Sequence, residues 1–298
     1  MTLSGYFLQI LVNQLFAAID CGVDKMKTTL GFSTIACPDL PWREVLSVGA
    51  ECGMKAVEIR LDREDRPFGL SDAELPELVA ALKENGLSAS DIGMGLALTD
   101  YRPGLDEKLT PVFERAAAIG AKGVRVFLGH SALRVPEGKT ENEEGIIRSV
   151  EEIARVAERY PADLWLETHG TYSRARDVMR VVRAVESDAV SVIWDIFHSY
   201  ELGESVDDSD AYLGDKTVHV HIKDGVKKKD DPDGGMTYTK VGEGEVPLGR
   251  SLELLEKRGY TGVLSLEWEN MWRPELRTVY PDLRSILAAY RAWFDSVK

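Results

Sequence analysis

The sequence is poor in cysteine and has no long apolar run, and each shortage excludes a class of protein. Its three cysteines in 298 residues, Cys21, Cys37 and Cys52, match neither a disulfide framework nor a thiolate metal site. The longest apolar stretch, residues 6–19, is interrupted by polar side chains and falls short of the ~20 residues that span a bilayer. We therefore expect a protein of the reducing cytoplasm with no transmembrane helix.

Positive charge is also scarce. The chain has 36 lysines and arginines against 50 acidic residues, which leaves a formal net charge of -14. Such a field repels nucleic acids and anionic membrane surfaces, so we expect neither as a partner. Hydrophobic residues make up 44% of the sequence and charged residues 29%, which is the composition of a folded globular protein with a full apolar core.

Residues 1–26 precede the first predicted strand and form an expected N-terminal extension to a catalytic domain over residues 27–298. The segment lacks the basic start and the small-residue cleavage site of a secretory signal. Its apolar side chains fall on one helical face, which predicts a helix packed on the body or on a partner, and a homo-oligomer stays open. An alternative is that the functional chain begins at Met26.

From Lys27 onward the sequence repeats a short β-rich apolar run, a polar or glycine-bearing loop and a longer stretch with helical periodicity. Four glycines, Gly53, Gly86, Gly120 and Gly259, follow helical patterns at points where a left-handed helix end is expected. Eight strands are predicted: Thr29–Ile35, Ala56–Leu61, Leu87–Ile92, Gly123–Leu128, Asp163–Thr168, Val190–Asp195, Thr217–Ile222 and Gly262–Glu267.

Eight βα units in about 270 residues, with no linker or break in composition, predict an α/β fold, a single (β/α)8 TIM barrel. Such a barrel carries its chemistry at the C-terminal ends of its strands. Two connections on that side are long, residues 93–109 and 225–248. Segments of this length are commonly binding loops or lids.

Polar residues at the predicted strand ends are concentrated on four neighbouring strands. Glu167 lies at the end of the fifth strand, Asp195 of the sixth, His221 of the seventh and Glu267 of the eighth. Three carboxylates at one level of a barrel repel one another unless a cation or protons neutralise them. Together with the imidazole they suit one divalent ion, Mn2+, Mg2+, Co2+ or Zn2+, with open positions for substrate oxygens.

Two of these predicted ligands have a neighbour that faces the same way, because side chains alternate along a strand. His221 is preferred to His219 because it is nearer the rim, and Glu267 to Glu269 because it still lies within the apolar run. The two neighbours are then expected to orient the ligands. His198, in the first turn beyond the sixth strand, can reach a substrate oxygen or the metal, and a helix cap or a surface imidazole is its alternative role.

Cationic side chains near the same strand ends would suit a phosphorylated substrate. Arg60, Arg125, Lys223 and the lysines at 227–229 are available, although the lysine run is more typical of a solvated surface. Other polar residues at these strand ends complete the expected contacts. The predicted substrate-binding residues from the cations and strand ends are Arg60, His169, Lys223 and Glu269.

Five segments resemble one family of barrels. They are LETHG, WDIFH, HVHIKD, VGEGEVP and LSLEWEN, and their order and spacing carry more weight than any one of them. Together they are similar to the xylose isomerase-like TIM-barrel superfamily, which includes sugar 3-epimerases, hydroxypyruvate isomerases, inosose and dehydroshikimate dehydratases and AP (abasic-site) endonucleases. The resemblance covers residues 29–294.

The resemblance implies roles for individual residues. In the epimerase branch the four positions predicted here as ligands hold one divalent ion. The positions of Glu167 and Glu267 also act as an acid and a base on opposite faces of the sugar. The position of His198 contacts a substrate oxygen, and that of Glu58 lines the same pocket.

The implied function is a metal-dependent sugar or sugar-phosphate isomerase or epimerase that transfers a proton next to a metal-bound carbonyl. A dehydratase of the inosose or 3-dehydroshikimate type and a sugar-binding barrel without turnover are the alternatives. Ketose 3-epimerase itself is disfavoured, because Ser173 stands where the epimerases place another glutamate and their strand-seven arginine has no clear counterpart. Five histidines and the acidic charge disfavour the nuclease branch.

Overall fold

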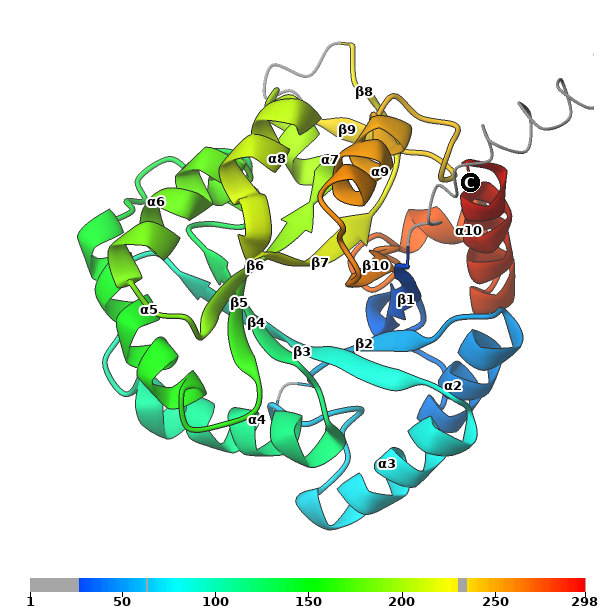
Figure 1. The fold of residues 1–298 in the computed structure, drawn as a ribbon, viewed down its shortest axis with the longest axis horizontal. Helices are drawn as coiled ribbons and strands as arrows, with labels where there is room; N and C mark the ends of the chain where they lie inside the picture. The colour runs from blue at the N-terminus through cyan, green and yellow to red at the C-terminus, as the bar shows by residue number, and fades with distance from the viewer. Residues whose placement is uncertain (1–26, 63, 230–234, 298) are drawn as a thin grey trace, which may run out of the picture.

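The computed structural model describes residues 27–62, 64–229 and 235–297 (Figure 1). The helix predicted within residues 1–26 therefore lies outside the described residues. None of the helices in the described ranges is long and apolar enough to cross a membrane.

Eight parallel strands close into a barrel, and the helices lie around its outside (Figure 1). The barrel strands are β1 Thr29–Ser33, β2 Ala56–Arg60, β3 Ser88–Leu98, β4 Gly123–Leu128, β5 Asp163–Glu167, β6 Val190–Asp195, β7 Thr217–Ile222 and β10 Val263–Leu266. Their order around the ring is β1-β10-β7-β6-β5-β4-β3-β2, so β10 closes the barrel against β1. The predicted (β/α)8 barrel is confirmed.

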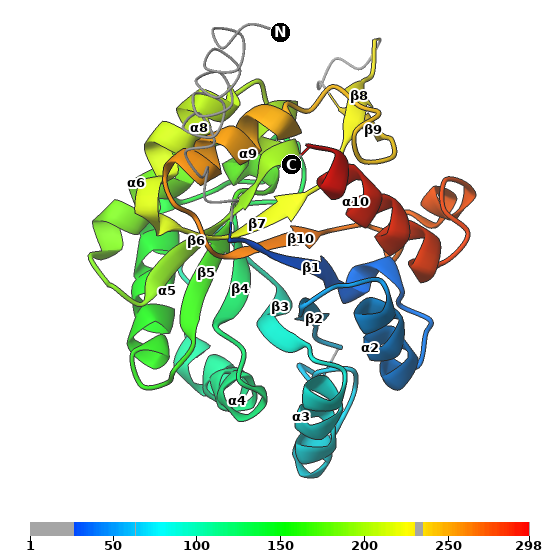
Figure 2. The same cartoon turned by 45° about the vertical axis from the view of Figure 1, so that its right-hand side comes forward.

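The connections contain the helices and one small hairpin. The long connection after β7 holds the antiparallel strands β8 (Gly225–Lys227) and β9 (Met236–Tyr238), which lie outside the ring of barrel strands (Figure 2). The α-helices are α2 Trp42–Glu51, α3 Leu75–Glu84, α4 Leu105–Ile119, α5 Glu143–Ala157, α6 Ala175–Val185, α7 Ile196–Glu201, α8 Val206–Leu213, α9 Leu248–Lys257 and α10 Leu283–Val297. Short 3-10 turns are η1 Thr34–Ala36, η2 Asp72–Glu74, η3 Gly170–Tyr172, η4 Gly214–Lys216 and η5 Pro274–Thr278.

The helices pack on the strands through the apolar stripes that the sequence predicts. In α5, Ile146, Val150 and Ile153 are fully buried, and the side chain of Asn142 caps the first turn by accepting a hydrogen bond from a backbone amide. Gly120 ends α4 with a φ of 76°, in the left-handed region that glycine adopts without strain. The layer between strands and helices is therefore a conventional hydrophobic core.

Strand β3 differs from its prediction, which ended it at Ile92. The strand continues to Leu98 through a register shift against β4, so much of the predicted loop is strand and helix. Glycine inside a strand usually weakens it, which is why the sequence pattern indicated an end. Here a Cβ at Gly93 would lie 2.8 Å from Nη2 of Arg125, and one at Gly95 would lie 2.6 Å from Nη2 of Arg60. The two glycines make room for two arginine side chains.

The inside of the barrel is polar. Glu58 on β2 lies 2.8 Å from His221 on β7, although two other strands separate β2 from β7 in the ring. Their side chains therefore meet across the barrel interior. Both are fully buried, as are Glu167 and Asp195. Buried charges of this kind are stable only when other charges and hydrogen bonds pair with them.

Candidate functional site

A cavity of about 610 Å³ lies at the C-terminal ends of the barrel strands. Its size is typical of small-molecule sites, and this end of a barrel is where active sites are found. Five of the residues predicted to form a site are among those that line it: Arg60, Glu167, His169, Glu267 and Glu269.

The four predicted metal ligands lie together. One carboxylate oxygen each of Glu167, Asp195 and Glu267 and one ring nitrogen of His221 all lie within 4.8 Å of one another, and all four residues are buried. The Nδ1 atom of His221 is 3.2 Å from Oε1 of Glu167, 3.3 Å from Oε2 of Glu267 and 3.5 Å from Oδ2 of Asp195. We call these four residues the quartet.

Strand register explains why these side chains converge. Asp195 pairs with His221 in the parallel β6–β7 ladder, and His221 pairs with Ser265 in the β7–β10 ladder. Glu267 comes two residues after Ser265, just beyond the end of β10, where its amide donates a hydrogen bond to the carbonyl of Ile222. Because alternate side chains of a strand share a face, this register favours the same inward side for the three functional groups.

Lys223 brings a positive charge against the quartet. Its Nζ atom lies 2.7 Å from Oδ2 of Asp195 and 3.0 Å from Oε1 of Glu269, and it also donates to Glu267. Burial disfavours the ammonium, but these three carboxylates outweigh it and raise the pKa of Lys223 well above its usual value. The lysine is fully buried and is not among the residues that line the cavity.

His198 is also buried. Its amide donates to Asp195 Oδ1, which caps α7, while its ring contacts Glu201 through Nδ1 at 3.2 Å and Lys223 through Nε2 at 3.1 Å. Burial and Lys223 lower the pKa of His198, but neighbouring carboxylates raise it to about 10. Its burial excludes the alternative of a surface imidazole, while its contact with a substrate oxygen or the metal stays a prediction.

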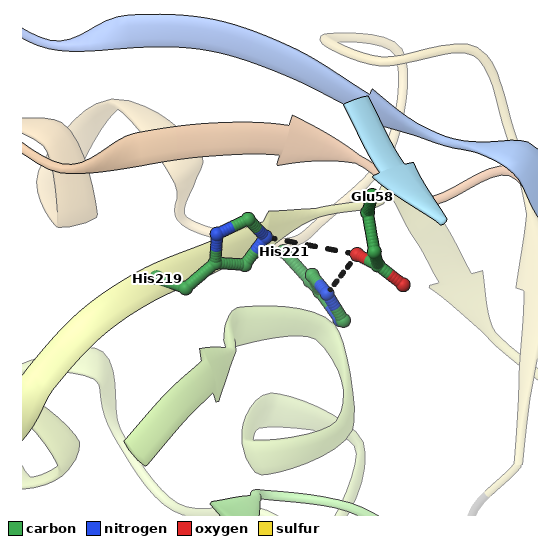
Figure 3. Close-up of side chains that lie close together, drawn as sticks. All are labelled: Glu58, His219 and His221. Carbon is green, nitrogen blue, oxygen red and sulfur yellow. Dashed lines mark hydrogen bonds and ion pairs between the residues drawn. The ribbon is translucent and has the colours of Figure 1, made fainter. Parts of the chain in front are cut away.

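Glu58, His219 and His221 form a second buried group, whose side chains point toward one another (Figure 3). Oε2 of Glu58 lies 2.8 Å from Nε2 of His221 and 3.6 Å from Nε2 of His219. Oε1 of Glu58 accepts a hydrogen bond from Ser33 at 3.0 Å. The ring of His219 packs against Trp165, with centroids 5.5 Å apart. Glu58 is fully buried and is not among the residues that line the cavity.

Arg125 links the two groups. Its Nε lies 3.2 Å from Oε2 of Glu167, and its Nη2 lies 3.5 Å from Oε1 of Glu58. Nη1 donates to the carbonyl of Met94, and the guanidinium lies over the ring of Phe127 at 4.3 Å. Burial disfavours its charge, but Glu167 and Glu58 raise the pKa of Arg125 above its usual value. Sequence reasoning treated this residue only as an anchor for phosphate; the signal it missed is an arginine inside the apolar strand pattern Val-Arg-Val.

Asp224 is a further residue that the sequence analysis did not assign. Its carboxylate accepts hydrogen bonds from the backbone amides of Gly225, Gly242, Gly244 and Val246. A Cβ at Gly244 would lie 2.0 Å from Oδ1 of Asp224, which leaves room only for glycine. The segment VGEGEVP is thus the loop that the last residue of HVHIKD holds in place, and the two motifs form one structural unit.

Comparisons with known proteins agree with this fold. A family model described as a xylose isomerase-like TIM barrel matches residues 46–290. The chain belongs to this family. The matched range contains the whole quartet and every barrel strand except β1.

Curated relatives of this xylose isomerase-like barrel carry the names of isomerases and epimerases. An inosose isomerase of Halalkalibacterium halodurans is 26% identical over 144 residues, which cover 46% of this chain and 49% of that protein. A fructoselysine 3-epimerase of Escherichia coli is 30% identical over 152 residues, which cover 49% of this chain and 52% of that protein. The chain thus spans about half the length of the curated relatives it matches.

Solved structures match over most of the chain and share its fold. A D-psicose 3-epimerase from Clostridium cellulolyticum, solved with D-tagatose, has a TM-score of 0.71 at 19% identity and covers 91% of this chain and 98% of that one. The IolI protein with a bound zinc atom has a TM-score of 0.69 at 21% identity and covers 91% and 97%.

Proposed function

We propose that this chain is a divalent-metal-dependent isomerase or epimerase that acts on a small sugar, polyol or sugar phosphate. The observation that carries the proposal is the quartet at the cavity. Three carboxylates and one imidazole within 4.8 Å fit one Mn2+, Mg2+, Co2+ or Zn2+ ion by the chemistry of their donor atoms. The names of the curated relatives, inosose isomerase and fructoselysine 3-epimerase, support the same class of reaction.

In this proposal the two glutamates of the quartet transfer the protons. A divalent ion held there would polarise a substrate carbonyl and acidify the adjacent C–H group. Glu167 and Glu267 line the cavity from β5 and from the end of β10, which β6 and β7 separate in the ring. The proposal has the two carboxylates act on the substrate from different sides, as their origin on separated strands allows. One removes the proton of the C–H group as general base, and the other returns a proton as general acid.

Glu58 has a positioning role in this proposal. Glu58 lies against Nε2 of the His221 imidazole. The other ring nitrogen of His221, Nδ1, faces the carboxylates of the quartet. If the carboxylate accepts a hydrogen bond from Nε2–H, the neutral imidazole would keep the lone pair of Nδ1 free to hold a divalent ion. With an ion bound, the arrangement would match the carboxylate–histidine–metal pattern that fixes the tautomer of a ligand.

The Glu58→Gln variant is expected to bind the ion about 10- to 100-fold more weakly, because outer partners of histidine ligands contribute that much to metal affinity. Equilibrium dialysis with Co2+, followed by the visible absorption of the bound ion, measures the change. Glu275→Gln, which removes a carboxylate that lines the cavity outside the quartet, is the matched control and should keep native affinity. Equal affinity in the Glu58 variant and in the native protein would contradict the positioning role.

The function itself is tested by turnover in deuterium oxide. Protein stripped of metal is reloaded with each of the four ions and incubated with ketoses, inososes and their phosphates. We expect an isomer or epimer that has gained one solvent deuterium next to the carbonyl, and only in metal-loaded samples. A product lighter by one water would support a dehydratase instead, and ligand binding without any product would support a non-catalytic barrel.

A further inference from the structure

The cationic side chains around the cavity differ in what neutralises them. Arg125, Lys223 and Arg273 each lie within ion-pair distance of at least one buried carboxylate. Arg60 does not: in the described ranges its guanidinium makes one hydrogen bond, from Nη1 to the carbonyl of Gly93 at 3.3 Å, and no ion pair. Arg60 is therefore the cation at this site with no carboxylate within ion-pair distance among those residues, and Glu58, Glu267 and Glu167 act on its charge only from farther away.

The surroundings of Arg60 resemble a binding site more than a structural one. The residue ends β2, lines the cavity and has its guanidinium 5.7 Å from the ring centroid of Trp272, which is 61% exposed. Burial and the neighbouring charge of Arg125 lower the pKa of Arg60 to about 10. A guanidinium offers five N–H donors in a planar fork that matches two oxygens of an anion. An arriving anionic group would supply a countercharge within ion-pair distance.

We propose that Arg60 and Trp272 form an anion-binding end of the cavity, so that the substrate carries a carboxylate or a phosphate group in addition to its carbonyl. The inference rests on the proposed function and narrows its substrate class. The oxyanion takes charge-assisted hydrogen bonds from Arg60, and the indole ring covers the guanidinium from one side. The reacting carbon of the substrate then lies at the quartet, where Glu167 and Glu267 act on it.

Gly95 supports this assignment. A Cβ at this position would lie 2.6 Å from Nη2 of Arg60, so only glycine leaves the guanidinium where it is. The Gly95→Ala variant should therefore displace the guanidinium while it keeps the charge of the chain. It complements Arg60→Gln, which removes the charge.

The test is calorimetric titration of the metal-loaded protein with D-fructose, D-fructose 6-phosphate, D-fructuronate and inorganic phosphate. We expect at least one of the two anionic sugars to bind about 10- to 100-fold more tightly than D-fructose, as charge-assisted hydrogen bonds from a guanidinium allow. Arg60→Gln should abolish this difference and Gly95→Ala should reduce it. The control Arg180→Gln, an exposed arginine paired with Glu143, should leave it unchanged.

The outcomes separate the two sources of the anion and the two proposals. Preference for D-fructose 6-phosphate together with competition by inorganic phosphate identifies a phosphate end, and preference for D-fructuronate without such competition identifies a carboxylate end. Equal affinity for neutral and anionic sugars, or a preference that survives Arg60→Gln, would overturn the anion site. Metal-dependent deuterium incorporation into a neutral sugar would leave the proposed function standing in that case.

Discussion

Replacing Glu267 by glutamine is expected to lower kcat by about a thousand-fold, while the affinity of the protein for its substrate stays within a few-fold of native. Glutamine keeps the shape of the side chain at the cavity wall but cannot accept or release a proton, and general acid–base catalysis typically contributes 10²–10⁴-fold. The variant should still bind a metal ion, since three ligands of the quartet remain. Steady-state kinetics at saturating metal, together with metal content, measure both effects.

The Glu275→Gln variant is the matched control for this experiment. Glu275 lines the same cavity but lies outside the quartet, so its loss should change kcat by no more than about three-fold. Native turnover in the Glu267 variant would refute the acid–base assignment. A parallel loss of metal and turnover would instead make Glu267 only a ligand.

The fold and the quartet could be predicted from the sequence because both depend on short-range periodicity. Two-residue alternation marks the strands, and regular spacing brings their C-terminal ends to one level. Glu167, Asp195 and Glu267 each come at the end of an apolar run, so the barrel alone determines that they converge. The choice of His221 over His219 needed only its position nearer the rim, and its Nδ1 does lie against the three carboxylates of the quartet.

Contacts across the barrel could not be predicted in this way, because no local pattern records which side chains meet in its interior. Lys223 was expected at the substrate, whereas the structure buries its ammonium among three carboxylates. Glu58 was expected to line the cavity, whereas it is fully buried against two histidines. The extension of β3 past Ile92 depends on arginines from neighbouring strands that take the space above its glycines.

The polar interior leads to a second large effect, on stability. Arg125 is the guanidinium between Glu58 and Glu167, and all three side chains are buried. Replacing it with methionine would fill much of the volume but leave two buried carboxylates without their shared cation. We expect a loss of about 3–5 kcal/mol in the free energy of unfolding, since removing one partner of a buried ion pair is strongly destabilising and here leaves both carboxylates to share His221. Urea denaturation of metal-stripped protein measures it.

A second substitution separates this electrostatic effect from a packing defect. If the unpaired charge is the cause, adding Glu58→Gln to Arg125→Met should restore at least about 1 kcal/mol, because it removes one of the two stranded carboxylates. Arg180→Met, at an exposed arginine, should change stability by less than about 0.5 kcal/mol. A double variant that is less stable than Arg125→Met alone would show that Glu58 is held by its contacts with Ser33 and the histidines, and that Arg125 stabilises the barrel mainly through Glu167.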